Sequence, residues 1–233
     1  MERRNVEISA LRTLRSGFLY LLVAVIMFVI AVVAGVFSIY AAFFLSISNP
    51  FTPMRPMTFA GALIILFLLL LVSIVILLYA IFGKIRPGMR QLSEVDSGFR
   101  ICYTGTTLMI VASFIAVLGL IIAIAVLASP MPSFTPPLTA LWILMLALVV
   151  ILVGGIIGLI GNILTFVVGA FKLHSRYQNI LYLVAGILFV VDILLMFLGL
   201  GGILSAVGYI LMYIALSDAI NKLSTAAATP AQT

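Results

Sequence analysis

The chain has 233 residues, of which 65% are hydrophobic and 8% are charged, and its formal net charge is +6. This composition excludes an ordinary soluble domain, and several apolar runs are longer than about 18 residues, the length that predicts membrane-spanning helices. No strand-like alternation accompanies them, so we predict an all-α polytopic membrane protein rather than a barrel.

Cysteine and histidine each occur once, as Cys102 and His174. One cysteine excludes a disulfide within the chain and a thiolate metal site, and one histidine excludes a bis-histidine haem. We therefore expect no metal and no cofactor. The basic residues flank apolar runs, which favours contact with anionic lipid headgroups over binding to nucleic acid.

The first helical hairpin is predicted from residue 1 to residue 83. Residues 1–17 form a lead-in with four arginines and apolar residues at near-helical spacing, which is typical of an interfacial amphipathic helix. A first span over 18–44, a Pro-rich turn and a second span over 58–83 follow. The apolar positions of the lead-in are Ile8, Leu11 and Leu14.

The second hairpin begins with a basic segment at 84–102, in which Pro87 suits the first position of a short helix. The third span is predicted at 103–128 and the fourth at 138–171, on either side of a second Pro-rich turn. A straight helix of the fourth span's length extends roughly 50 Å, against a hydrocarbon core of roughly 30 Å. This helix must tilt, break or project from the bilayer.

The second half of the fourth span carries small residues along one helical face, which lets a neighbouring helix approach closely. We favour packing within the chain, and a dimer seam or the wall of a pathway is the alternative. The residues of this small-residue stripe are Gly154, Gly158, Gly161, Thr165 and Gly169.

The third hairpin is predicted to contain a fifth span at 180–198, a glycine turn and a sixth span at 203–217. We expect the remaining residues, 218–233, to form a disordered cytoplasmic tail, because the end of the chain is small and polar and has nothing to bury. Together the spans make one transmembrane domain over 18–217.

The topology follows from the distribution of positive charge. Of the 12 Lys and Arg residues, all but Arg55 fall on one side of the predicted spans. The positive-inside rule therefore predicts six transmembrane helices as three hairpins in the cell membrane, with both termini in the cytoplasm.

Two tripeptides recur at nearly equal spacing. Ser-Gly-Phe stands at 16–18 and again at 97–99, and Phe-Thr-Pro stands at 51–53 and again at 134–136. A tandem copy of the first hairpin explains both, and chance recurrence in a chain of low complexity is the alternative.

Asp192 is the one acidic residue predicted inside a span, at a depth where a carboxyl costs about 2.5 to 3.5 kcal/mol on insertion scales. Counted from the cytoplasmic ends, Asn162 and Tyr209 lie at similar depths. We expect an Asp192–Asn162–Tyr209 cluster that joins three helices by hydrogen bonds, or alternatively binds a proton or cation. Because no second acid or base accompanies Asp192, we favour the structural use.

The combinations of residues typical of membrane enzymes are missing, since no histidine or second acid pairs with a nucleophile inside a span. We therefore predict a non-catalytic structural or accessory subunit, or scaffold, that associates with other membrane subunits or with its own copies. A small-solute or ion transporter using Asp192 is the alternative.

Two segments carry a resemblance to a known family, the opening Ala-Leu-Arg-Thr-Leu-Arg-Ser-Gly-Phe-Leu at 10–19 and the late Val-Gly-Tyr-Ile-Leu-Met-Tyr-Ile-Ala-Leu at 207–216. With them the chain resembles an archaeal family of multi-pass membrane proteins of unknown function, domain of unknown function 973. The resemblance implies an archaeal plasma membrane. It implies no activity, so it assigns no residue a role.

Overall fold

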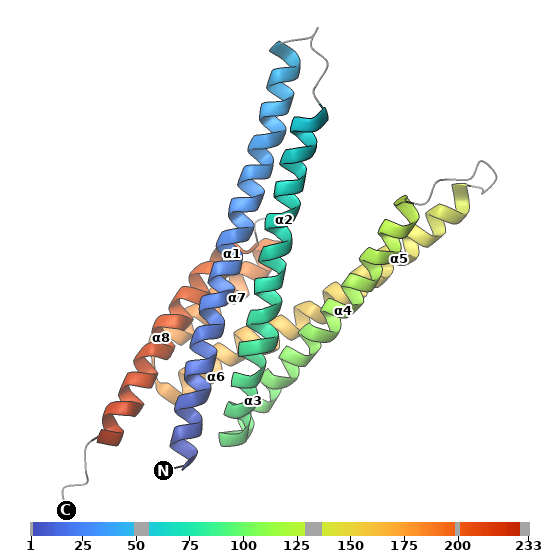
Figure 1. Cartoon of the computed structure of the whole chain (residues 1–233). Helices are drawn as coiled ribbons and strands as arrows, with labels where there is room; N and C mark the ends of the chain where they lie inside the picture. Colours follow the sequence, from blue (N-terminus) through green and yellow to red (C-terminus); the bar gives the residue numbers. More distant parts are fainter. Residues whose placement is uncertain (1, 49–55, 129–136, 199–200, 229–233) are drawn as a thin grey trace, which may run out of the picture.

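The computed structural model describes residues 2–48, 56–128, 137–198 and 201–228, and these form helices joined by short turns (Figure 1). The prediction of an all-α fold is confirmed. The α-helices are α1 (Glu2–Ser48), α2 (Pro56–Ala80), α3 (Arg86–Val95), α4 (Arg100–Ala128), α5 (Pro137–Asn162), α6 (Val168–Tyr177), α7 (Ile180–Met196) and α8 (Ile203–Ala228). Two π-helical segments, η1 (Ile81–Ile85) and η3 (Ile163–Val167), and a 3₁₀ turn, η2 (Ser97–Phe99), connect some of them.

Five helical stretches among the described residues are long and apolar enough to cross a membrane. The remaining apolar helix, α7, has 17 residues and is shorter than the others. Six spans with both termini inside therefore stay a prediction, whereas five long apolar helices are a property of the structure.

The two segments that flank the predicted transmembrane domain are largely helical. The predicted interfacial lead-in is, from Glu2, the first part of α1, and Leu11 and Leu14 are fully buried in the protein core. The prediction of a disordered tail from residue 218 is wrong as far as Ala228, because α8 continues that far. Ala219 and Ile220 are buried in the core, which supplies the apolar contact that this segment was not expected to have. Residues 229–233 lie outside the described part of the chain.

The predicted fourth span is a continuous helical rod made of α5, η3 and α6. Instead of breaking, the rod contains a π-helical turn at Ile163–Val167, where an extra residue is accommodated within the helix. Pro137 opens α5 and Pro56 opens α2, which are favourable positions because the first residue of a helix needs no N–H partner.

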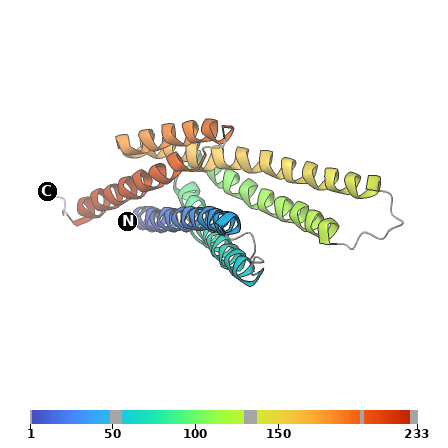
Figure 2. The same ribbon diagram turned by 90° about the horizontal axis from the view of Figure 1, so that it is seen from above.

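The helices form three hairpins, α1–α2, α4–α5 and α7–α8, that meet at one end of the molecule (Figures 1 and 2). At this end, which we call the base, α3 packs on α4, α6 packs on α7, and α8 packs on α1, so that the hairpins close a ring. The start of α1, the end of α8, α3 and α6 all lie at the base. Away from it, α1–α2 and α4–α5 diverge as two long arms.

The structure adds to the evidence for a tandem repeat. The π-helical segments η1 and η3 begin 82 positions apart, at 81 and 163, and each is followed by a 10-residue α-helix. An Asx turn also precedes the hairpins α4–α5 and α7–α8, with Asp96 accepting from Gly98 N–H and Asn179 accepting from Leu181 N–H. Chance repetition of tripeptides does not explain matching π-helical turns, so we interpret the first two hairpins as copies of one unit.

An aromatic cluster lies where the three hairpins meet. Phe18 of α1, Phe166 of η3, Phe189 of α7 and Tyr209 of α8 are buried, with neighbouring ring centroids 5.5 to 6.0 Å apart. Tilted and edge-to-face rings at such distances attract one another beyond the burial of their area. The cluster holds the hairpins together above the base.

Candidate functional site

Asp192 lies one turn before the end of α7 and is 7% exposed. Its carboxylate accepts the Gly202 N–H with both oxygens at 2.9 Å, and the Leu204 N–H at 3.0 Å. The Ser205 hydroxyl is a further partner, at 2.5 Å from Oδ2. The first N–H groups of a helix have no partner inside it, and a negative charge is favourable there. Asp192 therefore caps α8 from the preceding helix.

The other two residues of the predicted cluster are not hydrogen-bond partners of Asp192. Asn162 is half-buried at the end of α5, and Tyr209 packs into the aromatic cluster. The expectation of an Asp192–Asn162–Tyr209 hydrogen-bonded group therefore does not match the geometry. The physical reason is the short α7–α8 turn, which brings donors of α8 much closer to the carboxylate than the sequence-based depths indicate.

The small-residue stripe of α5, η3 and α6 faces α4 along most of its length. A Cβ built on Gly154 would lie 3.2 Å from Ala116 N, and one built on Gly161 would lie 2.8 Å from Gly105 O. At Gly158 the nearest contact is the Ala112 side chain, at 3.3 Å. The two helices thus approach backbone to backbone, as small residues allow.

The lower end of the stripe continues this contact. Thr165 is buried in η3, where its side chain and backbone lie under 3 Å from a Cβ built on Gly105. Gly169 lies against the side chains of Met89 and Cys102. The stripe therefore packs inside the chain, which leaves no need for a dimer seam to explain it.

A charged cluster at the base links segments far apart in sequence. Arg176 Nε donates to Glu7 Oε1 at 2.8 Å, and Arg176 Nη1 donates to Asp96 Oδ2 at 2.9 Å. The Tyr177 hydroxyl also donates to Glu7 Oε1, at 2.6 Å. The Glu7 side chain is 12% exposed and that of Arg176 is 29% exposed, so water screens this basal cluster less than it screens an exposed pair.

The basal cluster lies outside the predicted spans and shifts the pKa of both carboxyls. Burial raises the pKa of Glu7, but hydrogen bonds from Arg176 and Tyr177 outweigh it, so the pKa lies below its ordinary value. The Gly98 N–H, followed by Arg176, lowers the pKa of Asp96. Both groups are therefore carboxylates at neutral pH. Arg4 and Lys172 contribute further positive charge near Glu7 and Asp96, respectively.

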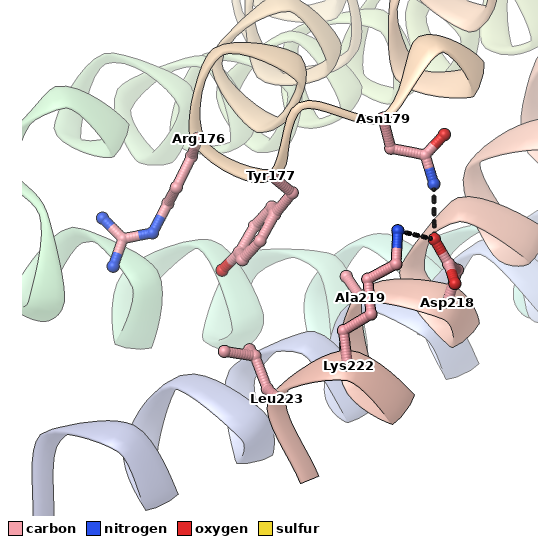
Figure 3. Close-up of a pocket in the computed structure, with 7 residues that line it drawn as sticks. All are labelled: Arg176, Tyr177, Asn179, Asp218, Ala219, Lys222 and Leu223. Carbon is pink, nitrogen blue, oxygen red and sulfur yellow. Dashed lines mark hydrogen bonds and ion pairs between the residues drawn. The ribbon is translucent and has the colours of Figure 1, made fainter. Parts of the chain in front are cut away.

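A pocket of about 210 Å³ lies beside the basal cluster, between the α6–α7 corner and α8 (Figure 3). Asp218 accepts from Asn179 Nδ2 at 3.0 Å and pairs with Lys222 Nζ at 2.8 Å. In Figure 3 the Arg176 guanidinium points away from this group. Its hydrogen bonds go to Glu7 and Asp96 of the basal cluster. The charges that line the pocket are paired with one another or with the basal cluster. The lining residues are Arg176, Tyr177, Asn179, Asp218, Ala219, Lys222 and Leu223.

Sequence reasoning did not find the basal cluster. Beside it, His174 Nδ1 lies 2.9 Å from Asn179 O, at the corner between α6 and α7. The signal present in the sequence is a small number of acids, Glu7, Asp96 and Asp218, beside basic segments at the ends of predicted helices. Among the described residues, no three His, Cys, Asp or Glu side chains gather in a group that could hold a metal ion.

The chain has long apolar helices, a buried carboxylate that caps α8, and paired charges at the base. These features are typical of an integral membrane protein built from helical hairpins. Residues 7–233 match a family described as a protein of unknown function, DUF973, and the chain belongs to that family. No curated protein and no solved structure matches the chain.

Proposed function

We propose that the protein is a non-catalytic subunit or scaffold of the cell membrane, with its base in the cytoplasm. The observation that carries this proposal is the α4–α5 arm. Along this arm the two helices pack mainly on each other, and large apolar side chains point outward from both. On α5 these exposed side chains include Leu148, Leu152 and Ile156. Such a surface suits lipid and the transmembrane helices of other subunits or copies.

The positive charge at the base supports the proposed orientation. Arg15 lies over the Tyr213 ring and Arg86 lies over the Tyr103 ring, with 5.7 and 5.8 Å from the guanidinium carbon to the ring centroid. Arginines that stack on tyrosines at the ends of apolar helices are typical of the membrane interface, where anionic headgroups lie nearby.

The transporter alternative has the tandem hairpins in its favour, because many transporters are built from internal repeats. Against it stands the use of Asp192, whose oxygens are occupied by N–H and O–H donors of α8. A site for a transported cation needs free oxygen ligands, and Asp192 offers few.

The test is to purify the tagged chain from native membranes in a mild detergent and identify the other proteins present by mass spectrometry. We expect a stoichiometric membrane partner or a defined homo-oligomer. Gly155 on the outer side of α5 provides a directed variant, because a Cβ there meets nothing within 4 Å. Gly155→Leu should leave the isolated chain folded and weaken an assembly that uses this face. Recovery of the chain as a monomer without a stoichiometric partner would contradict the proposal.

A further inference from the structure

The α7–α8 hairpin is much shorter than the other two. At 1.5 Å per residue, the 17 residues of α7 extend about 26 Å, whereas the 29 residues of α4 extend about 44 Å. Both helices begin at the base, because their preceding turns are held there through Asp96 and Asn179. The hydrocarbon core is roughly 30 Å thick, and any tilt shortens the reach of α7 further. In Figure 1 the α7–α8 hairpin ends well before the arms do.

The residues at the α7–α8 turn are apolar and exposed. Met196, Phe197, Leu198 and Ile203 have exposed fractions of 63, 76, 73 and 67%. The segments that connect the helices of the two arms instead contain Ser, Pro and Thr, at 48–57 and 129–137. A turn at the aqueous surface would present these large side chains to water, which is unfavourable in proportion to their exposed apolar area. The sequence of this turn is suited to lipid.

The backbone of the turn is also suited to lipid. Inside a bilayer no water can pair with the free N–H groups at the start of α8, so the protein must supply the acceptors. Asp192 does so for Gly202 and Leu204, and it pairs with Ser205 as well. Asp96 and Asn179 accept N–H groups in the same way at the base, but Asp192 is only 7% exposed, so this turn keeps its donors paired without water.

We infer that α7–α8 is a re-entrant hairpin, which enters the bilayer from the base and turns within it, so that Met196, Phe197, Leu198 and Ile203 contact lipid acyl chains. The chain then crosses the membrane four times, through the two long arms, and the third hairpin returns to the side from which it came. This leaves both termini on the same side. The inference rests on a membrane location, and it does not depend on the scaffold role.

The test uses fluorescence, because the chain has one tryptophan, Trp142, in the first turns of α5. Trp142 is exposed and close to the far end of its arm, so it reports on that surface. The double variant Trp142→Phe, Phe197→Trp moves the single tryptophan to the α7–α8 turn. Each protein is placed in vesicles whose lipids carry bromine either near the headgroup or near the end of the acyl chain.

We expect the fluorescence of the double variant to be lost mainly with bromine near the chain end and to resist iodide added to the water. The wild-type protein should show the opposite order. Loss of the double variant's fluorescence to iodide, or to headgroup bromine as for Trp142, would overturn the inference and place the turn at the far surface. Protection from both bromine positions would also overturn it, because protein would then cover the turn.

A cysteine variant provides a second measurement if the tryptophan variant does not fold. Leu198→Cys should resist a maleimide that cannot cross membranes, applied to either side, until detergent dissolves the bilayer. The native Cys102 is fully buried, so the unsubstituted chain gives the background. Rapid labelling from the far side in intact vesicles would exclude a re-entrant turn.

Discussion

Arg176 donates a hydrogen bond to Glu7 across 169 positions of sequence, so a side chain near the end of α6 holds the first turns of α1. The same guanidinium holds Asp96, which precedes α4. Arg176→Ala should lower the free energy of unfolding by about 1 to 3 kcal/mol, because it removes the charge-assisted hydrogen bonds that Arg176 donates to Glu7 and Asp96. Thermal unfolding in detergent measures this loss.

Arg90→Ala is the matched control for that variant. Arg90 pairs with Glu94 on the same helix at 3.6 Å, and both side chains are more than half exposed. Exposed pairs of this spacing contribute a few tenths of a kcal/mol. Equal losses for Arg176→Ala and Arg90→Ala would mean that the basal cluster does not hold the hairpins together.

The basal cluster also predicts a dependence of stability on pH. The pKa values of Glu7 and Asp96 are lower in the folded protein than in the unfolded chain. The two carboxylates therefore contribute fully to the free energy of unfolding above their pKa values in the unfolded chain, near pH 4. This contribution is lost as the pH falls through their lower pKa values in the folded protein. The melting temperature should fall on acidification from about pH 5 to about pH 3.

The double variant Glu7→Gln, Asp96→Asn isolates this effect. It should be less stable than the wild type at pH 7, and its melting temperature should change less over the acidic range because the two groups no longer titrate. The comparison requires a detergent without titratable groups. Parallel profiles for the two proteins would assign the acid sensitivity to other carboxyls.

The contact between α4 and α5 can be tested with two glycines of one helix. A Cβ on Gly161 would lie 2.8 Å from backbone and side-chain atoms of Gly105 and Met109, whereas a Cβ on Gly155 meets open space. Gly161→Ala should lower stability by about 1 to 3 kcal/mol through overpacking. Gly155→Ala should leave it unchanged or slightly higher, because alanine favours the helix. A neutral Gly161→Ala would show that the two helices can separate without cost.

The proposed orientation predicts which positions a membrane-impermeant maleimide reaches. Cysteines introduced at Ser48 and Ser133, in the segments with little positive charge, should react in intact cells. Cysteines at Glu94 and Ser175, beside the basic residues of the base, should react only after the cells are opened. Labelling of Glu94→Cys in intact cells would reverse the orientation.

Local sequence patterns predicted the helices and their pairing. The length of an apolar run depends on one helix alone, and the spacing of small residues depends on the contact between two helices that follow each other in the chain. The stripe from Gly154 to Gly169 is an example, since it faces the hairpin partner α4. The end of α8 was missed because its burial depends on α1, which is distant in sequence and near in the ring of hairpins.

The polar contacts could not be predicted in the same way. Counting depth along ideal helices put Asp192 beside Asn162, but the true acceptor–donor pairs depend on where the α7–α8 turn brings the start of α8. Likewise, nothing local connects Glu7 with Arg176, because their contact exists only once three hairpins share one base. Acidic and basic side chains lie at several helix ends, so many ion pairs are possible from the sequence. Only the arrangement of the helices in the fold determines which of them form.

Asp192 provides the last prediction, which separates the two candidate functions. If its role is to cap α8, Asp192→Asn should retain most of the stability, because the amide oxygen still accepts from the Gly202 and Leu204 N–H groups. Asp192→Leu should lose about 1 to 3 kcal/mol, because those N–H groups would be buried without partners. Neither variant should change the flux of protons or cations into liposomes relative to the wild type. If the wild type carries a flux that Asp192→Asn lacks at unchanged melting temperature, the carboxylate itself takes part in transport. That result would replace the scaffold proposal with the transporter.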